Sequence, residues 1–121
     1  MEYLGIIQDV SNLSDAGFYD VLKNSKKPFV ASHSNARSIC NHVRNMYDEM
    51  IKQLAHKGGV MGINFCADFI SSEKNGYTFG TISDTIEHIK YIRNIAGIDC
   101  IGLGSDYDGI PGNIEMKDCS Y

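Results

Sequence analysis

The sequence predicts an α/β protein in which about four βα units form part of a (β/α)8, or TIM, barrel. Four short apolar segments each end in polar residues, and they are residues 5–11, 29–34, 60–65 and 100–106. Between them the apolar residues recur at helical spacing, an alternation typical of βαβ units with a parallel sheet. TIM barrels carry their active sites at the carboxyl ends of such strands, and a complete barrel needs about 250 residues. A chain of 121 residues is therefore predicted to form roughly half of one.

The first predicted unit joins the strand at residues 5–11 to a helix over residues 15–22. Ser14 precedes this helix, and a serine oxygen in that place accepts a hydrogen bond from a backbone N–H group of the first turn. The apolar face of the helix consists of Phe18, Val21 and Leu22. Pro28 then begins the second strand, residues 29–34.

The second predicted helix runs from about residue 48 to residue 57. Residues 58 and 59 are both glycine, which favours the left-handed conformation that ends helices. The expected buried residues of this helix are Met50, Ile51 and Leu54. After the third strand, the segment 71–80 is polar and contains glycine, which predicts a long loop above Asn64.

The third predicted helix has the clearest pattern. Five isoleucines recur at spacings of three or four between residues 82 and 95, with Ser83 near the start and Gly97 just past the end. The tail, residues 110–121, has no helical pattern. A final helix covering the last strand is therefore not expected.

Composition argues against several classes of protein. The formal net charge is −4 and no basic stripe could neutralise phosphates, so a nucleic-acid partner is not expected. No segment approaches the roughly 18 apolar residues of a membrane span, and the first residues do not form a signal peptide. A cytoplasmic protein without a membrane partner is expected. The cysteines are widely spaced and are expected to be reduced core thiols rather than metal ligands or a disulfide: Cys40, Cys66, Cys100 and Cys119.

Residues able to bind metal or move protons lie at the ends of the four predicted strands. They are Asp9, His33, Asn64 and Asp106. Each candidate also has a structural interpretation. His33 is alternatively a hydrogen-bonded histidine in a polar pocket, and Asn12 is a turn residue before a helix. Asp106 is alternatively part of an Asx turn with Asp108.

Other charged residues complete the candidate set. Arg44 and the neighbouring His42 follow the second strand, and exposed arginines are usually solvated. Arg37 is expected to pair with a carboxylate or with backbone near the strand ends. His56 and His88 lie among Lys and Glu in predicted helices and are interpreted as surface residues.

Five short motifs occur in order along nearly the whole chain. They are Asp9-Val10-Ser11, Ser32-His33-Ser34-Asn35, Arg44-Asn45, Gly62-Ile63-Asn64-Phe65 and Gly104-Ser105-Asp106-Tyr107-Asp108-Gly109. Together they resemble the motifs of the membrane dipeptidase (renal dipeptidase-like) family of zinc peptidases. That family consists of TIM-barrel enzymes, so the resemblance implies a single partial domain, residues 1–121, equivalent to roughly the fifth to eighth strands of the barrel. The family's amino-terminal His-x-Asp motif and bridging Glu have no counterpart here, which predicts a carboxyl-terminal fragment.

The resemblance implies roles for four residues. His33 corresponds to a zinc ligand, and Asn12 stands where the family pattern has the histidine that is its partner ligand. An amide oxygen is a poorer zinc donor than imidazole, so the second zinc is expected to bind weakly. Asp106 corresponds to the residue that handles a proton when the tetrahedral intermediate breaks down. Arg44 corresponds to the arginine that binds the terminal carboxylate of the substrate.

The implied function is that of a dipeptidase in which two zinc ions assist hydrolysis of a dipeptide amide bond. A catalytic zinc usually needs about three protein ligands, so a chain that offers His33 is expected to bind zinc weakly and to be inactive without the missing half of the barrel. The alternative is a non-catalytic half-barrel remnant, or pseudoenzyme, that forms a homo-oligomer to cover its open sheet edges. An amidohydrolase-type barrel is disfavoured because no lysine lies at a predicted strand end.

Overall fold

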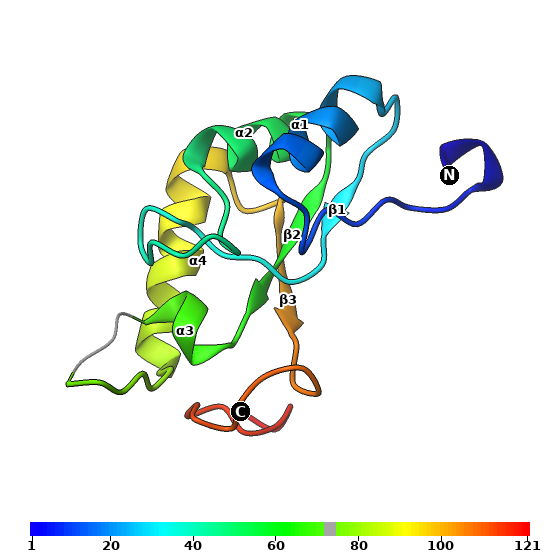
Figure 1. Cartoon of the computed structure of the whole chain (residues 1–121). Coiled ribbons are helices and arrows are strands. Elements are labelled where there is room, and N and C mark those ends of the chain that lie inside the picture. Colours follow the sequence, from blue (N-terminus) through cyan, green and yellow to red (C-terminus); the bar gives the residue numbers. More distant parts are fainter. Residues whose placement is uncertain (72–74) are drawn as a thin grey trace.

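A computed structural model describes residues 1–71 and 75–121 and shows an α/β fold (Figure 1). Its elements, in order, are η1 (Glu2–Leu4), α1 (Asp15–Asn24), β1 (Val30–Ala31), α2 (Asp48–His56), β2 (Val60–Asn64), α3 (Ala67–Ile70), α4 (Ile82–Ala96) and β3 (Ile101–Ser105). In the described part of the chain, the three strands form one parallel sheet in the order β1-β2-β3. Helices α2 and α4 pack against each other and against the sheet, with α4 alongside β2 and β3. The predicted α/β class with parallel strands is confirmed.

The prediction of a strand at residues 5–11 is wrong. This segment lies parallel to β1 but forms a single β-bridge, between Asp9 and Val30. The ladder stops because the Asp9 carboxylate accepts the next N–H group of the β1 side, that of Ser32 at 3.0 Å, while Val10 O accepts from Leu13 N instead. The segment therefore has the predicted neighbour without the predicted strand.

The three predicted helices are present as α1, α2 and α4, and their ends follow the predicted signals. Ser14 caps α1 by accepting a hydrogen bond from a backbone N–H group in the first turn. Gly58, just after α2, has a φ of +74°, the left-handed conformation expected of a helix terminator. Helix α4 has Thr81 as its N-cap, and Ser83 lies in its first turn, near the start as predicted. Thr81 and Asp84 form a reciprocal capping box.

The core lies between the sheet and the helices. Its largest fully buried apolar side chains are Phe18, Phe29, Ile51, Leu54, Met61, Ile63, Ile70 and Ile92. All three predicted core residues of α2 are buried. Burial of each such side chain stabilises the fold by about 1.5–3 kcal/mol, so the packing of α1, α2 and α4 fixes the sheet that carries the strand ends.

His88 corrects the interpretation of this residue as a surface histidine, because its side chain is 0% exposed. It lies on the same face of α4 as Thr85 and Ile92, three residues before and four residues after it, and both of these are buried. Its Nδ1 accepts a hydrogen bond from Ala36 N (3.2 Å), and its Nε2 lies 3.2 Å from Ile70 O. Burial lowers the pKa of His88 to about 4, although the bond to the Ile70 carbonyl opposes this shift. The prediction was wrong because the charged neighbours of His88 in the sequence lie on other faces of the helix. His56, in contrast, is exposed as predicted.

The segments that follow β2 and β3 contain features that the sequence pattern did not predict. The short helix α3 comes directly after β2. Part of the predicted 71–80 loop, residues 72–74, lies outside the described residues, and residues 75–80 form turns and a bridge from Gly80 to Ile114. The tail, residues 110–121, continues from the end of β3 as turns around that bridge (Figure 1).

The cysteines are all free, as predicted, but they do not all lie in the core. Cys40, Cys66 and Cys100 are buried, and burial raises the pKa of each thiol. Cys119 is exposed, because it lies in the tail rather than under a helix. Across residues 1–71 and 75–121, no helix has both the length and the apolar character needed to cross a membrane.

Candidate functional site

The carboxyl ends of the strands come together where two glycines allow close approach of the backbones. A Cβ atom at Gly62 in β2 would lie 2.2 Å from Ser32 O, and one at Gly104 in β3 would lie 2.0 Å from the same oxygen. The pairing of β2 with β3 then shifts register, so that Asn64 lies opposite Ser105. The segments that follow all three strands therefore leave one edge of the sheet side by side.

Asp9 joins the segment 5–11 to the segment that follows β1. Its Oδ1 accepts the N–H groups of Ser11 and Ser32, and the Ser32 hydroxyl donates to its Oδ2. Burial acts to raise the pKa of Asp9, but the hydrogen bonds from Ser32 and Ser11 outweigh burial and lower that pKa below its ordinary value. Asp9 is thus a carboxylate acceptor that fixes the backbone around the next two candidates.

His33 and Asn12 lie in direct contact. Asn12 Nδ2 is 3.0 Å from His33 Nε2, and Ser32 Oγ is 2.8 Å from His33 Nδ1. The backbone N–H of His33 donates to Ser11 Oγ at 3.0 Å. The structure therefore brings together the two positions that the sequence associates with metal, and it gives both ring nitrogens of His33 a partner within the chain.

Asp106 lies just past β3 and contacts the end of β2. Asn64 Nδ2 donates to Asp106 Oδ2 at 3.0 Å. Asp106 has a φ of 70°, a left-handed conformation that Asp adopts more readily than most residues, and Gly109 N donates to Asp106 O at 2.9 Å to close the following turn. The Asp106 carboxylate therefore faces along the shared edge of the sheet.

Asn35 connects the segment after β1 to the end of β2, and the sequence predicted no role for it beyond its place in a motif. Its Nδ2 donates to Asn64 O at 2.9 Å, and its Oδ1 accepts from Asn64 N at 3.1 Å. Both asparagines are fully buried. Cys66 N donates to Asn64 Oδ1 at 2.7 Å, which orients the Asn64 amide so that its nitrogen faces Asp106. The available signal was the position of Asn35 directly after Ser32-His33-Ser34.

Arg44 lies over an aromatic ring that was not predicted to belong to the site. Its Cζ is 5.3 Å from the centroid of Phe69, and the His42 ring is 4.6 Å from the same centroid. Among the described residues, no acceptor bonds the buried Nε of Arg44. Arg44 and Asn12 line one small cavity. The signal for Phe69 was an aromatic residue a few positions after the strand end at Asn64.

Arg37 braces the segment that carries Arg44, as expected for an arginine paired with a carboxylate and backbone. Its guanidinium donates to both carboxylate oxygens of Asp15, at 3.0 and 2.9 Å. It also donates to Asn45 O at 2.7 Å and to Val43 O at 2.9 Å. The hydrogen bonds to Asp15 raise the pKa of Arg37. Arg37 is therefore a structural residue that fixes the backbone on either side of Arg44.

The side chains of this edge do not fit a two-zinc centre. Zinc in proteins is held by imidazole, thiolate and carboxylate groups. Within residues 1–71 and 75–121, no group of three or more His, Cys, Asp or Glu residues is arranged so that it could hold a metal ion. His33 has a hydrogen-bond partner at each ring nitrogen, and its neighbour Asn12 offers an amide. The ligand set that the resemblance implies is therefore incomplete in the described part of the chain.

Parallel strands that alternate with helices, with polar side chains at the carboxyl ends of the strands, place this chain in the α/β class to which TIM barrels belong. The chain belongs to the membrane dipeptidase family, peptidase family M19, whose family model matches residues 1–121. It is 41% identical over 111 residues to an uncharacterised dipeptidase of Schizosaccharomyces pombe. The matched region covers 92% of this chain and 26% of that protein.

Two solved structures place the fold within a larger barrel. A metallopeptidase of Rhodobacter sphaeroides, liganded with a phosphinate mimic of the dipeptide L-Ala-D-Ala, superposes with a TM-score of 0.83 at 31% identity, covering 89% of this chain and 31% of that one. A dipeptidase described as a metallopeptidase of family M19 superposes with the same TM-score and identity, covering 89% of this chain and 32% of that one. The chain thus spans less than a third of the length of these relatives and has the fold of part of their barrel.

Proposed function

We propose that this chain forms the carboxyl-terminal wall of a dipeptidase site, in which Arg44 binds the terminal carboxylate of a dipeptide and Asp106 handles a proton. The observation that carries the proposal is the shared edge of the sheet. Hydrogen bonds join Asp9 to Ser32, Asn35 to Asn64, and Asn64 to Asp106, so the ends of successive strands form one continuous wall. Membership of the membrane dipeptidase family supports the reaction class.

Arg44 is suited to a substrate carboxylate by its chemistry and by its surroundings. A planar guanidinium presents paired N–H donors that match the two oxygens of a carboxylate. Stacking over Phe69 and the bracing of Val43 and Asn45 by Arg37 restrict its position before a ligand arrives. Prior restriction lowers the conformational entropy that binding costs. The dipeptide mimic bound to the Rhodobacter sphaeroides relative supports dipeptides as the substrate class.

Asp106 is suited to proton transfer by its place at the edge. It is partly exposed, and Asn64 Nδ2 donates to one of its carboxylate oxygens, which leaves the other oxygen available to a ligand. A carboxylate can take a proton from, or return it to, a reacting group within hydrogen-bond reach. Its hydrogen bond to the fully buried Asn64 holds it at the wall rather than in solvent.

The isolated chain is proposed to be inactive and to bind zinc weakly. Its relatives are about three times as long, since the chain covers 26% to 32% of their lengths, and the ligand set at the described edge is incomplete. The remaining ligands and the opposite wall would come from the other half of a barrel. A cytoplasmic location remains part of this proposal.

Dipeptide binding by the purified chain tests the role of Arg44 without requiring turnover. We expect L-Ala-D-Ala to shift the NMR signals of Arg44 and Phe69 at millimolar concentrations, and its carboxamide derivative to shift them far less. Arg44→Gln should remove the preference for the free carboxylate, while the exposed Asn94→Ala serves as a matched control. Equal shifts with both ligands would contradict the role of Arg44. A hydrolysis assay on the same chain with added Zn²⁺ should show no turnover, and turnover would overturn the proposed inactivity.

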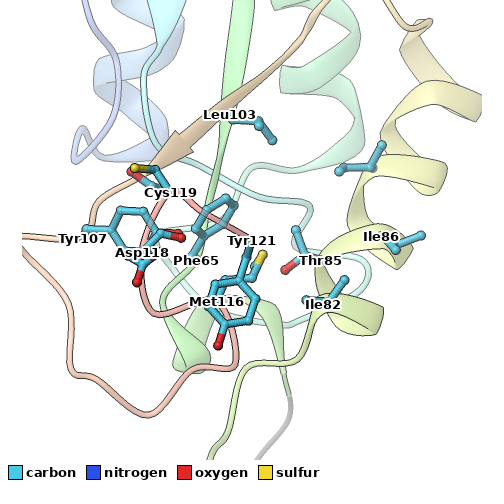
Figure 2. Close-up of a pocket in the computed structure, with 12 residues that line it drawn as sticks. Phe65, Ile82, Thr85, Ile86, Leu103, Tyr107, Met116, Asp118, Cys119 and Tyr121 are labelled. Carbon is cyan, nitrogen blue, oxygen red and sulfur yellow. The ribbon is translucent and has the colours of Figure 1, made fainter.

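A second candidate function, self-association, is favoured by an exposed apolar surface at the edge strand β3. Leu103 in β3 is 76% exposed and borders an apolar groove of about 330 Å³ between α4 and the tail. Figure 2 shows Leu103 on β3, Ile86 on α4 and Tyr121 in the tail among the residues that line this groove. An open strand edge with apolar side chains is a surface on which a second chain can pair. Sedimentation of the purified chain tests this candidate, and a monomer at high concentration would exclude it.

A further inference from the structure

We infer that Asn12 hydrogen-bonds the His33 ring and thereby removes from metal binding the ring nitrogen that faces it. In this chain His33 would be an interior member of a hydrogen-bonded relay, Asp9–Ser32–His33–Asn12, rather than a zinc ligand. The premise that His33 would bind zinc if Asn12 were absent rests on the proposed function. The relay itself rests only on the contacts of the described residues.

The single hydroxyl hydrogen of Ser32 determines which atom donates in each hydrogen bond of the relay. The Ser32 hydroxyl has a single hydrogen, and the Asp9 carboxylate beside it is acceptor-only, so Ser32 donates to Asp9. Ser32 Oγ must then accept from His33 Nδ1, which lies 2.8 Å away. A neutral imidazole with a proton on Nδ1 has its lone pair on Nε2. Nε2 therefore accepts from Asn12 Nδ2, at 3.0 Å.

The backbone holds Asn12 in the position that this contact requires. Asn12 has a φ of 70°, one of four positive φ values among the described non-glycine residues, and asparagine adopts this conformation more readily than most residues. On the other side, Ser11 Oγ accepts the backbone N–H of His33 at 3.0 Å. Both partners are thus fixed before any ligand binds. The left-handed backbone at residue 12 thus places the exposed Asn12 amide beside the half-buried His33 ring.

The relay leaves no ring nitrogen of His33 ready for a metal ion. Nδ1 carries a proton, and the lone pair of Nε2 points at an N–H donor whose nitrogen offers no lone pair to zinc. Zinc could bind Nε2 only after the Asn12 amide has turned away, and the hydrogen bond it makes opposes that movement. Asn12 therefore provides no imidazole ligand of its own, and it also hydrogen-bonds the ring nitrogen through which His33 would bind zinc.

The tautomer of His33 tests this inference directly. In a long-range ¹H–¹⁵N NMR spectrum of the whole chain at neutral pH, we expect Nδ1 of His33 to carry the proton and Nε2 to show the shift of a hydrogen-bonded lone pair. Asn12→Gly preserves the left-handed backbone and removes the amide, and should move the Nε2 shift toward that of a free lone pair. Asn94→Ala, an exposed asparagine on α4, should leave both shifts unchanged. A proton on Nε2 of His33 in the unmodified chain would overturn the inference.

Zinc titration gives a second readout at the same residue. With Zn²⁺ added to each protein, the concentration that half-saturates the His33 ring signals should fall about fivefold to tenfold in Asn12→Gly, because a competing hydrogen bond is removed. It should fall further in Asn12→His, which adds a second imidazole. Equal half-saturation of His33 in the unmodified chain and Asn12→Gly would refute the inference. These signals do not depend on dipeptide binding, so a failure of the proposed function would appear separately in the Arg44 experiment.

Discussion

Acidification from pH 7 to pH 5 should destabilise the folded chain through the buried histidine His88. Its Nδ1 accepts from Ala36 N and its Nε2 is bonded to Ile70 O, so the neutral ring links the segment after β1, α3 and α4. A proton on Nδ1 would remove the acceptor that Ala36 requires. The fold therefore excludes the protonated ring, whereas the unfolded chain accepts it freely.

The magnitude follows from the two pKa values of His88. Burial lowers the folded pKa to about 4 from the ordinary value of 6.5. Because the unfolded chain takes up a proton first, the stability of the fold decreases as the pH falls through 6.5 and levels off near 4. Between pH 7 and pH 5 this one group should lower the free energy of unfolding by about 2 kcal/mol.

Urea denaturation followed by circular dichroism at pH 7 and pH 5 measures this change. His88→Gln removes the titrating ring, so the variant should lose about 2 kcal/mol less between the two pH values than the unmodified chain. His56→Gln, at an exposed histidine of α2, is the matched control and should retain the full pH dependence. If His88→Gln kept the same pH dependence as the unmodified chain, the buried neutral state of His88 would be wrong.

Three further predictions concern the N-cap of α4, the close approach of β3 to the Ser32 carbonyl and the exposed apolar surface of β3. Thr81→Ala removes the hydrogen bond to Asp84 N that begins α4 and should lower the free energy of unfolding by about 1 kcal/mol in urea denaturation, and an unchanged midpoint would contradict the cap. Gly104→Ala places a Cβ atom against Ser32 O and should cost at least about 2 kcal/mol in the same assay, whereas a neutral effect would argue against the close strand approach. Leu103→Lys should change stability by less than about 0.5 kcal/mol, because the side chain is exposed, and should reduce self-association in sedimentation; an oligomer of unchanged size would exclude the β3 edge as the contact.

The elements with strong periodic patterns were predictable from the sequence. Helices α2 and α4 begin and end within a few residues of the prediction, because apolar spacing, caps and terminal glycines act locally. Strand β2 was predictable because it is a continuous apolar segment buried from Met61 to Asn64. These signals depend on neighbours in the sequence and require no knowledge of the fold.

The errors arose where a contact between residues distant in the sequence decides the outcome. Residues 5–11 have the composition of a strand, but the Asp9 carboxylate accepts the backbone N–H of Ser32, which would otherwise extend the ladder. His88 has charged neighbours, yet its position on α4 places it against Ala36 and Ile70. No local pattern contains these contacts.

The candidate site was predictable at the level of position and less so at the level of contact. The rule that parallel strands share a carboxyl edge predicted that His33 and Asp106 would lie along it, and the structure places both there. The contact of His33 with Asn12, and that of Arg44 with Phe69, depend on backbone conformation after the strands end. The functional roles of these residues remain predictions.

Nuclear Overhauser effects from the side-chain amides of two asparagines test most directly whether the strand ends share one wall. The structure predicts strong effects between the Asn12 amide protons and the His33 ring, whose nitrogens are 3.0 Å apart, and between the Asn35 amide protons and the backbone at Asn64. If both were absent in a chain whose other signals show a folded protein, the shared carboxyl edge would be contradicted.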